Sequence, residues 1–324
     1  MNRKAFLTSI MGIFGSFFLN STYAEDFPSK PIKILLGFGA GGSSDQFTRD
    51  FSRLLALKLG KPVVVENKPG AATTISTTFL FNAPADGYTL SIVSSHFAST
   101  PKLYPNLPYD VTTDFTHIAL QVAIPFILVV NPNLKVNTLQ EFIALIKSQP
   151  GKYSYGSTGT GGVVHLATER FKQVAGIDIA HIPYKSDIDA LLSLIRGDVS
   201  FQFGAPSTCL PHIQSGAVKA LAWSGIARSA AFTDVPTIAE SGYLGFSTFA
   251  WFGFIGPPKI PKVIVDRLAK ESQAIMSSSE MQAKIINQGM VPISDTMTDK
   301  FTGFIKSETE KWGSIISSTG VKAE

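Results

Sequence analysis

Short apolar runs alternate along the chain with stretches whose apolar residues recur at helical spacing. Residues 32–38 (IKILLGF) form an apolar run that is typical of a strand buried on both faces. In the following segment, the apolar residues of 47–55 share one helix face, and Gly60 suits the end of that helix. Residues 62–65 then predict a second strand. The order strand, helix, strand is the repeating unit of an α/β protein.

The same alternation continues through most of the chain. It predicts helices at 74–83, 139–147, 163–174 and 188–195, a shorter helix near Pro211, and strands at 88–94, 127–130, 153–157, 179–182, 200–203 and 218–223. Helical patterns dominate from residue 261 onward. This order favours an α/β fold with parallel sheets, and 324 residues are enough for two domains. Because no Pro/Gly/Ser-rich linker is present, we expect strands that cross between the domains and a binding cleft between them.

The first residues have the pattern of a secretory signal peptide. Arg3 and Lys4 precede an apolar run over residues 5–19, and Thr22 to Ala24 place small residues at a cleavage site. A membrane anchor is the alternative, but a spanning helix needs about 20 apolar residues and this run is shorter. We therefore interpret residues 1–24 as a cleavable signal peptide and expect the mature protein in the periplasm.

Charge and cysteine content exclude several kinds of partner. Removal of Arg3 and Lys4 leaves 26 basic against 24 acidic residues, a balance that does not favour nucleic-acid binding. The basic residues are scattered, so an anionic membrane surface is not predicted either. The single cysteine, Cys209, cannot form an internal disulfide and lies far from the signal region, which excludes a lipid on a processed N-terminal cysteine. We expect a soluble monomer.

Two glycine-rich loops, one in each half of the chain, have a common chemical use. Residues 39–42 (GAGG) end the first strand, and Ser43 or Ser44 can cap the helix that follows. Residues 156–162 (GSTGTGG) precede another predicted helix in the same way. Such loops present backbone N–H groups and the positive end of a helix dipole to an anion. One loop can be an ordinary tight turn, but two are what a cleft with donors on either wall requires.

An enzyme is the main alternative. Gly39-x-Gly41-x-x-Ser44 approaches the dinucleotide fingerprint, and Glu66 can stand in for the ribose-binding acid, as in a nicotinamide-dependent oxidoreductase. Against this, Ser44 replaces the third glycine, and an exported protein does not normally meet free NAD. A purely structural surface protein is the third class, which ligand-dependent domain closure would separate from a receptor.

The sequence does not otherwise favour catalysis. Ser157 stands between Tyr155 and Gly159 rather than in a nucleophile elbow. The histidines at 96, 117, 165, 181 and 212 lack the spacing of a zinc site. We expect no catalytic residue, no metal and no cofactor.

Four polar residues near the loops each have two interpretations. His165 can donate to a ligand or serve as a capping or surface residue, and Tyr184 can offer a hydroxyl or an aromatic wall or pack in the core. Asp45 can complement the helix dipole in the first turn or contact the ligand. Asp187 can be a helix N-cap, or its carboxylate can face the cleft and pair with an amine or ring N–H of the ligand.

Six motifs in register resemble the Bug family, also called the tripartite tricarboxylate transporter receptor family. They are GFGAGGSSDQFTR (37–49), ENKPGA (66–71), ADGYTL (85–90), YGSTGTGGVVHLATERFKQVAGIDIAHIPYK (155–185), DVPTIAESG (234–242) and WFGFIGP (251–257). The resemblance covers essentially the whole mature chain. It implies a type II periplasmic binding protein of the Venus-flytrap kind, with two α/β domains joined by two crossover strands. With the order of the βα units, it predicts one domain from 25–125 and 227–324 and the other from 126–226.

The resemblance also implies a ligand and its binding residues. The ligand is a small organic carboxylate, captured for membrane transporter subunits or for sensing and held by neutral backbone and hydroxyl donors. Loops 37–45, 94–100, 156–165 and 204–208 contain no Arg or Lys, so we expect no arginine clamp; Lys185 is the nearest cation. The predicted ligand-binding residues are Phe38, Gly41, Gly42, Ser43, Ser44, Asp45, Ser94, Ser95, Ser157, Thr160, Gly161, Gly162, His165, Tyr184, Asp187, Ala205 and Ser207.

The chain departs from the family pattern at two places. Ala40 stands where the first loop usually has proline, which should loosen the loop only modestly. Ser186-Asp187 replaces a common glycine-containing step and brings a negative charge near the expected cleft. The second departure weakens the assumption of a simple dicarboxylate ligand.

Overall fold

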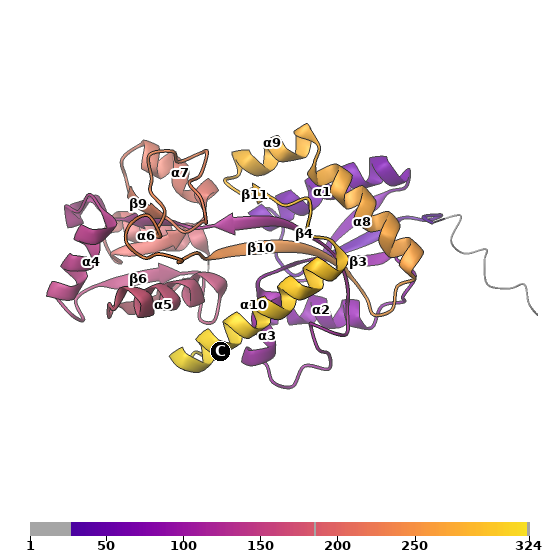
Figure 1. Cartoon of the computed structure of the whole chain (residues 1–324), viewed down its shortest axis with the longest axis horizontal. Helices are drawn as coiled ribbons and strands as arrows, with labels where there is room; N and C mark the ends of the chain where they lie inside the picture. Colours follow the sequence, from indigo (N-terminus) through magenta and orange to yellow (C-terminus); the bar gives the residue numbers. More distant parts are fainter. Residues whose placement is uncertain (1–26, 185, 323–324) are drawn as a thin grey trace, which may run out of the picture.

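The computed structural model describes residues 27–184 and 186–322, which form two lobes, each built around one β-sheet (Figure 1). The first sheet has the strand order β11-β4-β10-β3-β1-β2 and the second β7-β6-β8-β5-β9. The predicted signal peptide lies outside the described residues. Within the described part of the chain, no helix has both the length and the apolarity needed to cross a bilayer.

The first lobe contains elements from both ends of the chain. They are β1 (Ile32–Leu36), α1 (Ser43–Leu59), β2 (Val63–Asn67), α2 (Thr74–Phe81), β3 (Thr89–Ser94), α3 (His96–Leu103) and β4 (Thr116–Pro125), then β10 (Phe249–Gly256), α8 (Lys262–Met276), α9 (Ser279–Asn287), β11 (Val291–Pro292) and α10 (Thr298–Thr319). Short 3-10 turns lie at Ala71–Thr73 and, in the other lobe, at Pro132–Leu134.

The second lobe is formed by the middle of the chain. Its elements are β5 (Ile127–Val130), α4 (Leu139–Ser148), β6 (Ser154–Ser157), α5 (Val163–Ala175), β7 (Ala180–Pro183), α6 (Asp187–Arg196), β8 (Phe201–Gly204), α7 (Pro206–Gln214) and β9 (Lys219–Trp223). Here the predicted strands and helices agree with the structure to within two residues at almost every end. Cys209 is a free, buried thiol on α7.

Both sheets are mixed rather than uniformly parallel. β1 pairs in parallel with β2 and β3, and β6 pairs in parallel with β7 and β8. β10 is antiparallel to β3 and β4, and β5 is antiparallel to β8 and β9. The α/β prediction is therefore confirmed, whereas the parallel pairing holds only for strands joined through helices. β5 and β10 enter their sheets from the other lobe, so no crossover helix requires them to run parallel.

The chain passes between the lobes twice. Phe126 alone separates β4 from β5, so the predicted first boundary at 125/126 falls at this crossing. The return runs from the end of β9 to the start of β10, and β4 and β10 lie side by side between the lobes (Figure 1). The predicted return at residue 227 needs correction, because Phe232, Ile238 and Phe246 pack in the core of the second lobe. That segment joins the first lobe only at Phe249.

The C-terminal helix α10 packs across both lobes. It contacts α3 of the first lobe and α5 of the second, and the amide of Gln173 on α5 donates to the hydroxyl of Ser318 at 3.1 Å. On its inner face, the buried carboxylate of Glu308 accepts hydrogen bonds from the indole N–H groups of Trp251 and Trp312, each at 2.9 Å. The C-terminal end of α10 therefore lies beside α5 of the second lobe.

Candidate functional site

The first glycine-rich loop is held by the side chain of Asp45. The Gly41 N–H donates to Asp45 Oδ2 at 2.9 Å, and the Asn67 amide donates to Asp45 Oδ1 at 2.9 Å. The same Asn67 amide donates to the Phe38 carbonyl, also at 2.9 Å, so the end of β2 is tied to the loop after β1. Asp45 is buried, with 3% of its surface exposed. Its carboxylate therefore organises the loop from beneath.

Arg49 keeps Asp45 ionised. Arg49 Nε lies 2.9 Å from Asp45 Oδ2, one helical turn away. This hydrogen bond, with those from Gly41 and Asn67, lowers the pKa of Asp45 to about 2, although burial opposes the shift. The N-cap of α1 is Gly42, so the predicted capping by Ser43 or Ser44 is wrong. The first-turn N–H groups of α1 thus lack a capping side chain, while Ser43 stays exposed and Ser44 is buried.

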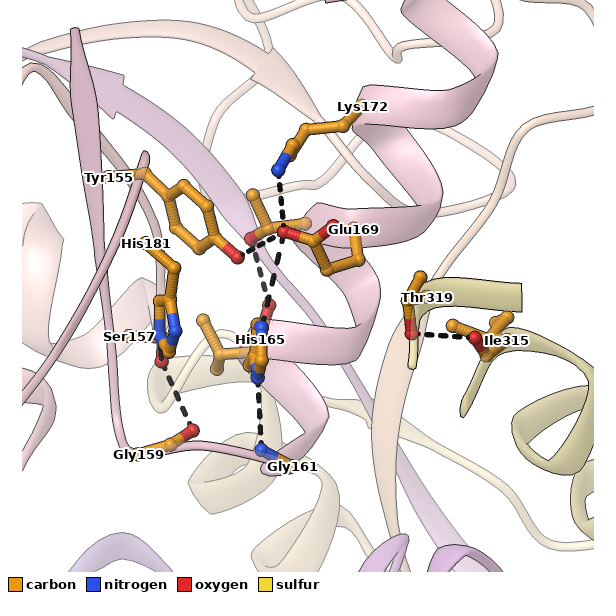
Figure 2. Close-up of polar contacts among 12 residues, drawn as sticks. Tyr155, Ser157, Gly159, Gly161, His165, Glu169, Lys172, His181, Ile315 and Thr319 are labelled. Carbon is orange, nitrogen blue, oxygen red and sulfur yellow. Dashed lines mark hydrogen bonds and ion pairs between the residues drawn. The ribbon is translucent and has the colours of Figure 1, made fainter. Parts of the chain in front are cut away.

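The second loop repeats this arrangement with a different side chain (Figure 2). α5 begins after the N-cap Gly162, and the Gly161 N–H donates to His165 Nδ1 at 2.9 Å. Gly41 and Gly161 both have positive φ, 89° and 76°, which favours glycine at each position. Both are followed by an extended glycine N-cap, and both are held by the third residue of the helix. The two loops therefore share one local geometry, with Asp45 replaced by His165.

A stack of rings supports the second loop. The imidazoles of His165 and His181 lie 3.9 Å apart with an interplanar angle of 11°, and the Tyr155 ring stacks on His181 at 4.9 Å. The Tyr155 hydroxyl donates to Glu169 at 2.6 Å, and Lys172 lies 2.9 Å from the same carboxylate oxygen. Figure 2 shows this group running from the strands to α5.

Ser157 and His181 form a close pair that the sequence did not predict. Ser157 Oγ lies 2.7 Å from His181 Nε2 and 3.2 Å from the Gly159 carbonyl. The atoms resemble a nucleophile and its base, but Ser157 has none of its surface exposed, so a substrate cannot reach it. The pairing of β6 with β7 could have suggested the contact, because it places His181 opposite Tyr155, two residues before Ser157.

The residues after β3 lie beside the first loop. The rings of Phe38 and His96 meet edge to face at 5.7 Å, and Ser94 Oγ lies 3.1 Å from His96 Nδ1. Burial lowers the pKa of His96 to about 4, so this imidazole is neutral at physiological pH. The hydroxyl of Ser95, by contrast, accepts the backbone N–H of Trp251 on β10 at 3.0 Å. Ser94 and Phe38 are therefore together at the loop, whereas Ser95 is used by the sheet.

Asp187 is not the N-cap of α6. That position is Ser186, whose hydroxyl accepts the Asp189 N–H at 3.2 Å. Asp187 instead accepts the Gln202 amide on Oδ1 at 2.6 Å and the Ala205 N–H on Oδ2 at 3.3 Å. Its carboxylate thus joins β8 to the start of α7, where the N-cap is Ala205.

The remaining predicted residues lie just after strands β6, β7 and β8 of the second lobe. Tyr184 donates its N–H to the Ser157 carbonyl at 2.9 Å, and its ring is close to Gly156, where an added Cβ would lie 3.3 Å away. Ser207 is exposed in the first turn of α7, and Thr160 is partly exposed in the second loop. Lys185 lies outside the described residues. The structure therefore brings together Gly156, Ser157 and Tyr184.

The dinucleotide alternative receives no support from the end of β2. Glu66, the predicted ribose-binding acid, lies 2.6 Å from both Lys33 and Lys68. These cations lower the pKa of Glu66, so the carboxylate is committed to two ion pairs.

Comparisons with known proteins agree on one family. Residues 47–321 match the family model described as tripartite tricarboxylate transporter family receptor. The chain is 35% identical to Protein BugT of Bordetella pertussis, over 98% of this chain and 99% of that protein. The solved periplasmic binding protein BugD is 30% identical, with 92% of this chain and 100% of that chain covered and a TM-score of 0.79.

Two further solved structures contain carboxylates. Rpa4515 of R. palustris, solved with adipate, is 28% identical and covers 92% of this chain and 99% of its own, with a TM-score of 0.81. MatC of Rhodopseudomonas palustris, solved with bound malate, is 26% identical and covers 90% and 100%, with a TM-score of 0.77.

Proposed function

This chain belongs to the tripartite tricarboxylate transporter receptor family, a family of solute-binding receptors and not of enzymes, and from that membership we propose that it captures a small dicarboxylate between its lobes. The nicotinamide-dependent alternative is set aside, because the family is not enzymatic and Glu66 is already ion-paired.

The observation that carries the proposal is the matched pair of glycine loops. α1 and α5 each begin at a glycine N-cap, so no capping side chain competes for the N–H groups of either first turn. Each loop is preformed by a hydrogen bond from its glycine to the third residue of the helix. An N-terminus of this kind favours an anion through its N–H groups and its dipole. Two of them, one per lobe, suit a ligand with a carboxylate at each end.

The donors proposed for the ligand are neutral. They are the N–H groups of Gly42, Ser43 and Ser44 in the first loop and of Thr160 and Val163 in the second, with the hydroxyls of Ser43 and Thr160. The Gly41 and Gly161 N–H groups hold the loops in place instead, because Asp45 and His165 accept them. Phe38, Ser94, Tyr184 and Ser207 complete the proposed site. Arg49 lies next to the first loop, but it is paired with Asp45. Affinity then depends on backbone geometry rather than on a guanidinium clamp.

The ligands of two solved relatives support a dicarboxylate. Adipate and malate both carry two carboxylate groups, and they differ in length. We further propose that the protein works in the periplasm after removal of residues 1–24, and that it delivers its ligand to membrane transporter subunits or reports its concentration.

A thermal-shift screen of the mature protein tests the proposal. A ligand that binds only the folded state raises the free energy of unfolding, by RT ln(1 + L/Kd) at ligand concentration L, so the melting temperature rises with affinity and concentration. We expect stabilisation by at least one dicarboxylate, such as adipate or malate, without turnover of the ligand by mass spectrometry. Monocarboxylates of matched length are the control, and they should stabilise less. Turnover of the bound molecule, or stabilisation by NAD in place of any carboxylate, would contradict the proposal.

A further inference from the structure

The two glycine loops have the same geometry but are held by chemically different acceptors. In the first loop, Asp45 accepts the Gly41 N–H and remains ionised far below physiological pH, because its pKa is about 2. In the second, the acceptor is the imidazole Nδ1 of His165. A carboxylate accepts in its charged form, whereas an imidazole nitrogen accepts only when it carries no proton. The loops must therefore respond differently to acid.

The contacts of His165 fix its protonation state. Because Nδ1 accepts from Gly161, the hydrogen of the neutral ring is on Nε2, which faces Glu169 Oε1 at 4.0 Å. His165 is 5% exposed, and burial lowers its pKa below the usual value, with Glu169 opposing the shift and Lys172 adding to it. The imidazole is thus neutral at pH 7, and the Gly161 bond is intact.

The groups around His165 make it unfavourable for both stacked imidazoles, His165 and His181, to be protonated at the same time. Glu169 and Lys172 face His165 from its own helix, α5. Tyr155 faces it from β6 and His181 from β7. On the neighbouring α10, Figure 2 shows the uncharged residues Ile315 and Thr319. Two parallel imidazoles at 3.9 Å repel each other when both are charged. Glu169 already accepts from Tyr155 and Lys172, so Lys172 offsets its charge and Glu169 compensates an added charge on the imidazole pair only weakly.

We propose that the Gly161–His165 hydrogen bond is a titratable clamp: the neutral imidazole positions the second loop for the ligand, and protonation at Nδ1 releases the loop and weakens binding. His165 is then a positioning residue, not a ligand contact. The first loop, held by Asp45, stays in place over the same pH range. This inference rests on the proposed function, since it specifies how the same site depends on pH.

A ligand-free measurement tests the clamp directly. We would follow the ¹⁵N signals of the His165 imidazole and the amides of Gly41 and Gly161 between about pH 8 and about pH 5. We expect an unprotonated Nδ1 at the upper pH and a Gly161 amide that moves with the His165 titration while the Gly41 amide does not. A hydrogen on Nδ1 at the upper pH, or a Gly161 amide that ignores the titration, would overturn the inference.

Ligand binding provides the second measurement, with adipate as the probe. His165→Gln supplies an amide oxygen that can accept the Gly161 N–H at the third helical position without titrating. Between a pH above the His165 titration and a pH below it, both taken from the NMR measurement, we expect the wild-type affinity to fall about fivefold more than that of His165→Gln, the factor that one hydrogen bond is worth. His212→Gln on α7 is the matched control and should follow the wild type.

The outcomes separate the clamp from the proposed function. An equal loss of affinity in the wild type and His165→Gln would overturn the clamp while leaving the receptor function standing. Absence of adipate binding at either pH would count against the proposed function, and the ligand-free titration would still decide the clamp. That titration uses the wild-type protein, so it decides the matter even where His165→Gln fails to fold.

Discussion

Ser224 and Thr248 bond to each other in both directions where the chain returns between the lobes. The Ser224 hydroxyl donates to the Thr248 carbonyl at 2.6 Å, and the Thr248 N–H donates to the Ser224 carbonyl at 2.9 Å. The outgoing segment is bound in the same way, because Phe126 donates to Ser224 Oγ at 2.7 Å and accepts from Ser224 N–H at 2.9 Å. One buried serine therefore ties both crossing segments together.

The substitution Ser224→Ala should lower the free energy of unfolding by about 2 kcal/mol. It removes a buried hydroxyl that both donates and accepts, and it leaves the Phe126 N–H without that acceptor. Urea unfolding measures the effect. Ser314→Ala, at an exposed position of α10, is the control and should change stability by no more than about 0.5 kcal/mol. Equal values for the two variants would show that the crossing does not depend on this hydroxyl.

Asp45→Ala should cost about 2 kcal/mol of stability and also weaken carboxylate binding. The change leaves the Gly41 N–H and the Asn67 amide without their shared acceptor. Asp299, an acid in the first turn of α10, provides the control, since Asp299→Ala removes a first-turn charge from an exposed position. Loss of stability with unchanged affinity would mean that the loop does not position the ligand.

The contribution of the Asp45 carboxylate to folding stability should decrease as the pH falls. Its folded pKa, about 2, is below the usual 3.8, so the unfolded state binds the proton more readily. The stabilisation is present above about pH 3.8 and is lost as pH falls toward 2. The difference in unfolding free energy between wild type and Asp45→Ala should narrow over that window, and a constant difference would contradict this assignment.

The contribution of Asp187 to stability should change with pH in the opposite direction. Burial raises the pKa of its carboxyl above 3.8, although Thr208, Ala205 and Gln202 oppose the shift. The folded state therefore binds the proton more readily, and the wild type should gain stability relative to Asp187→Asn as pH falls from neutral toward 3.8. Chemical unfolding at a series of pH values measures this difference, and a trend in the other direction would exclude a buried, proton-binding carboxyl.

The same variant tests whether Asp187 selects ligands. Both carboxylate oxygens already accept from protein donors, so we expect Asp187→Asn to leave the ranking of ligands unchanged. Selection through a ligand amine or ring N–H stays a prediction from the sequence. It requires that Asp187→Asn lower the affinity for such ligands by more than about tenfold relative to plain dicarboxylates. Calorimetric titration with paired amino and plain dicarboxylates decides between the two roles.

Much of the fold could be predicted from local sequence patterns. The features that could not be predicted depend on contacts between residues far apart in the sequence. The second lobe was predictable because each strand and helix is short and bounded by turn residues. The strands β4 and β10 were not predicted, because the two pair across more than a hundred residues and the whole second lobe lies between them in the chain. The return of the chain at Phe249 is likewise set by packing of Phe232, Ile238 and Phe246.

The candidate site was predictable as loops but not as contacts. The glycines and the helix starts were visible in the sequence, yet Asp45 and His165 were each given two roles, because spacing does not show where a side chain points. The acceptor role of His165 needs the loop geometry that brings Gly161 to its Nδ1. The role of Asp187 depends on Gln202 and Ala205, 15 and 18 residues along the chain.

A crystal structure of the mature protein with a bound dicarboxylate would show whether the two glycine loops hold the ligand. We expect one carboxylate at the loop after β1 and one at the loop after β6, each accepting backbone N–H groups at hydrogen-bond distance, without an arginine in contact. A ligand held by a bidentate arginine, or bound away from both loops, would contradict it.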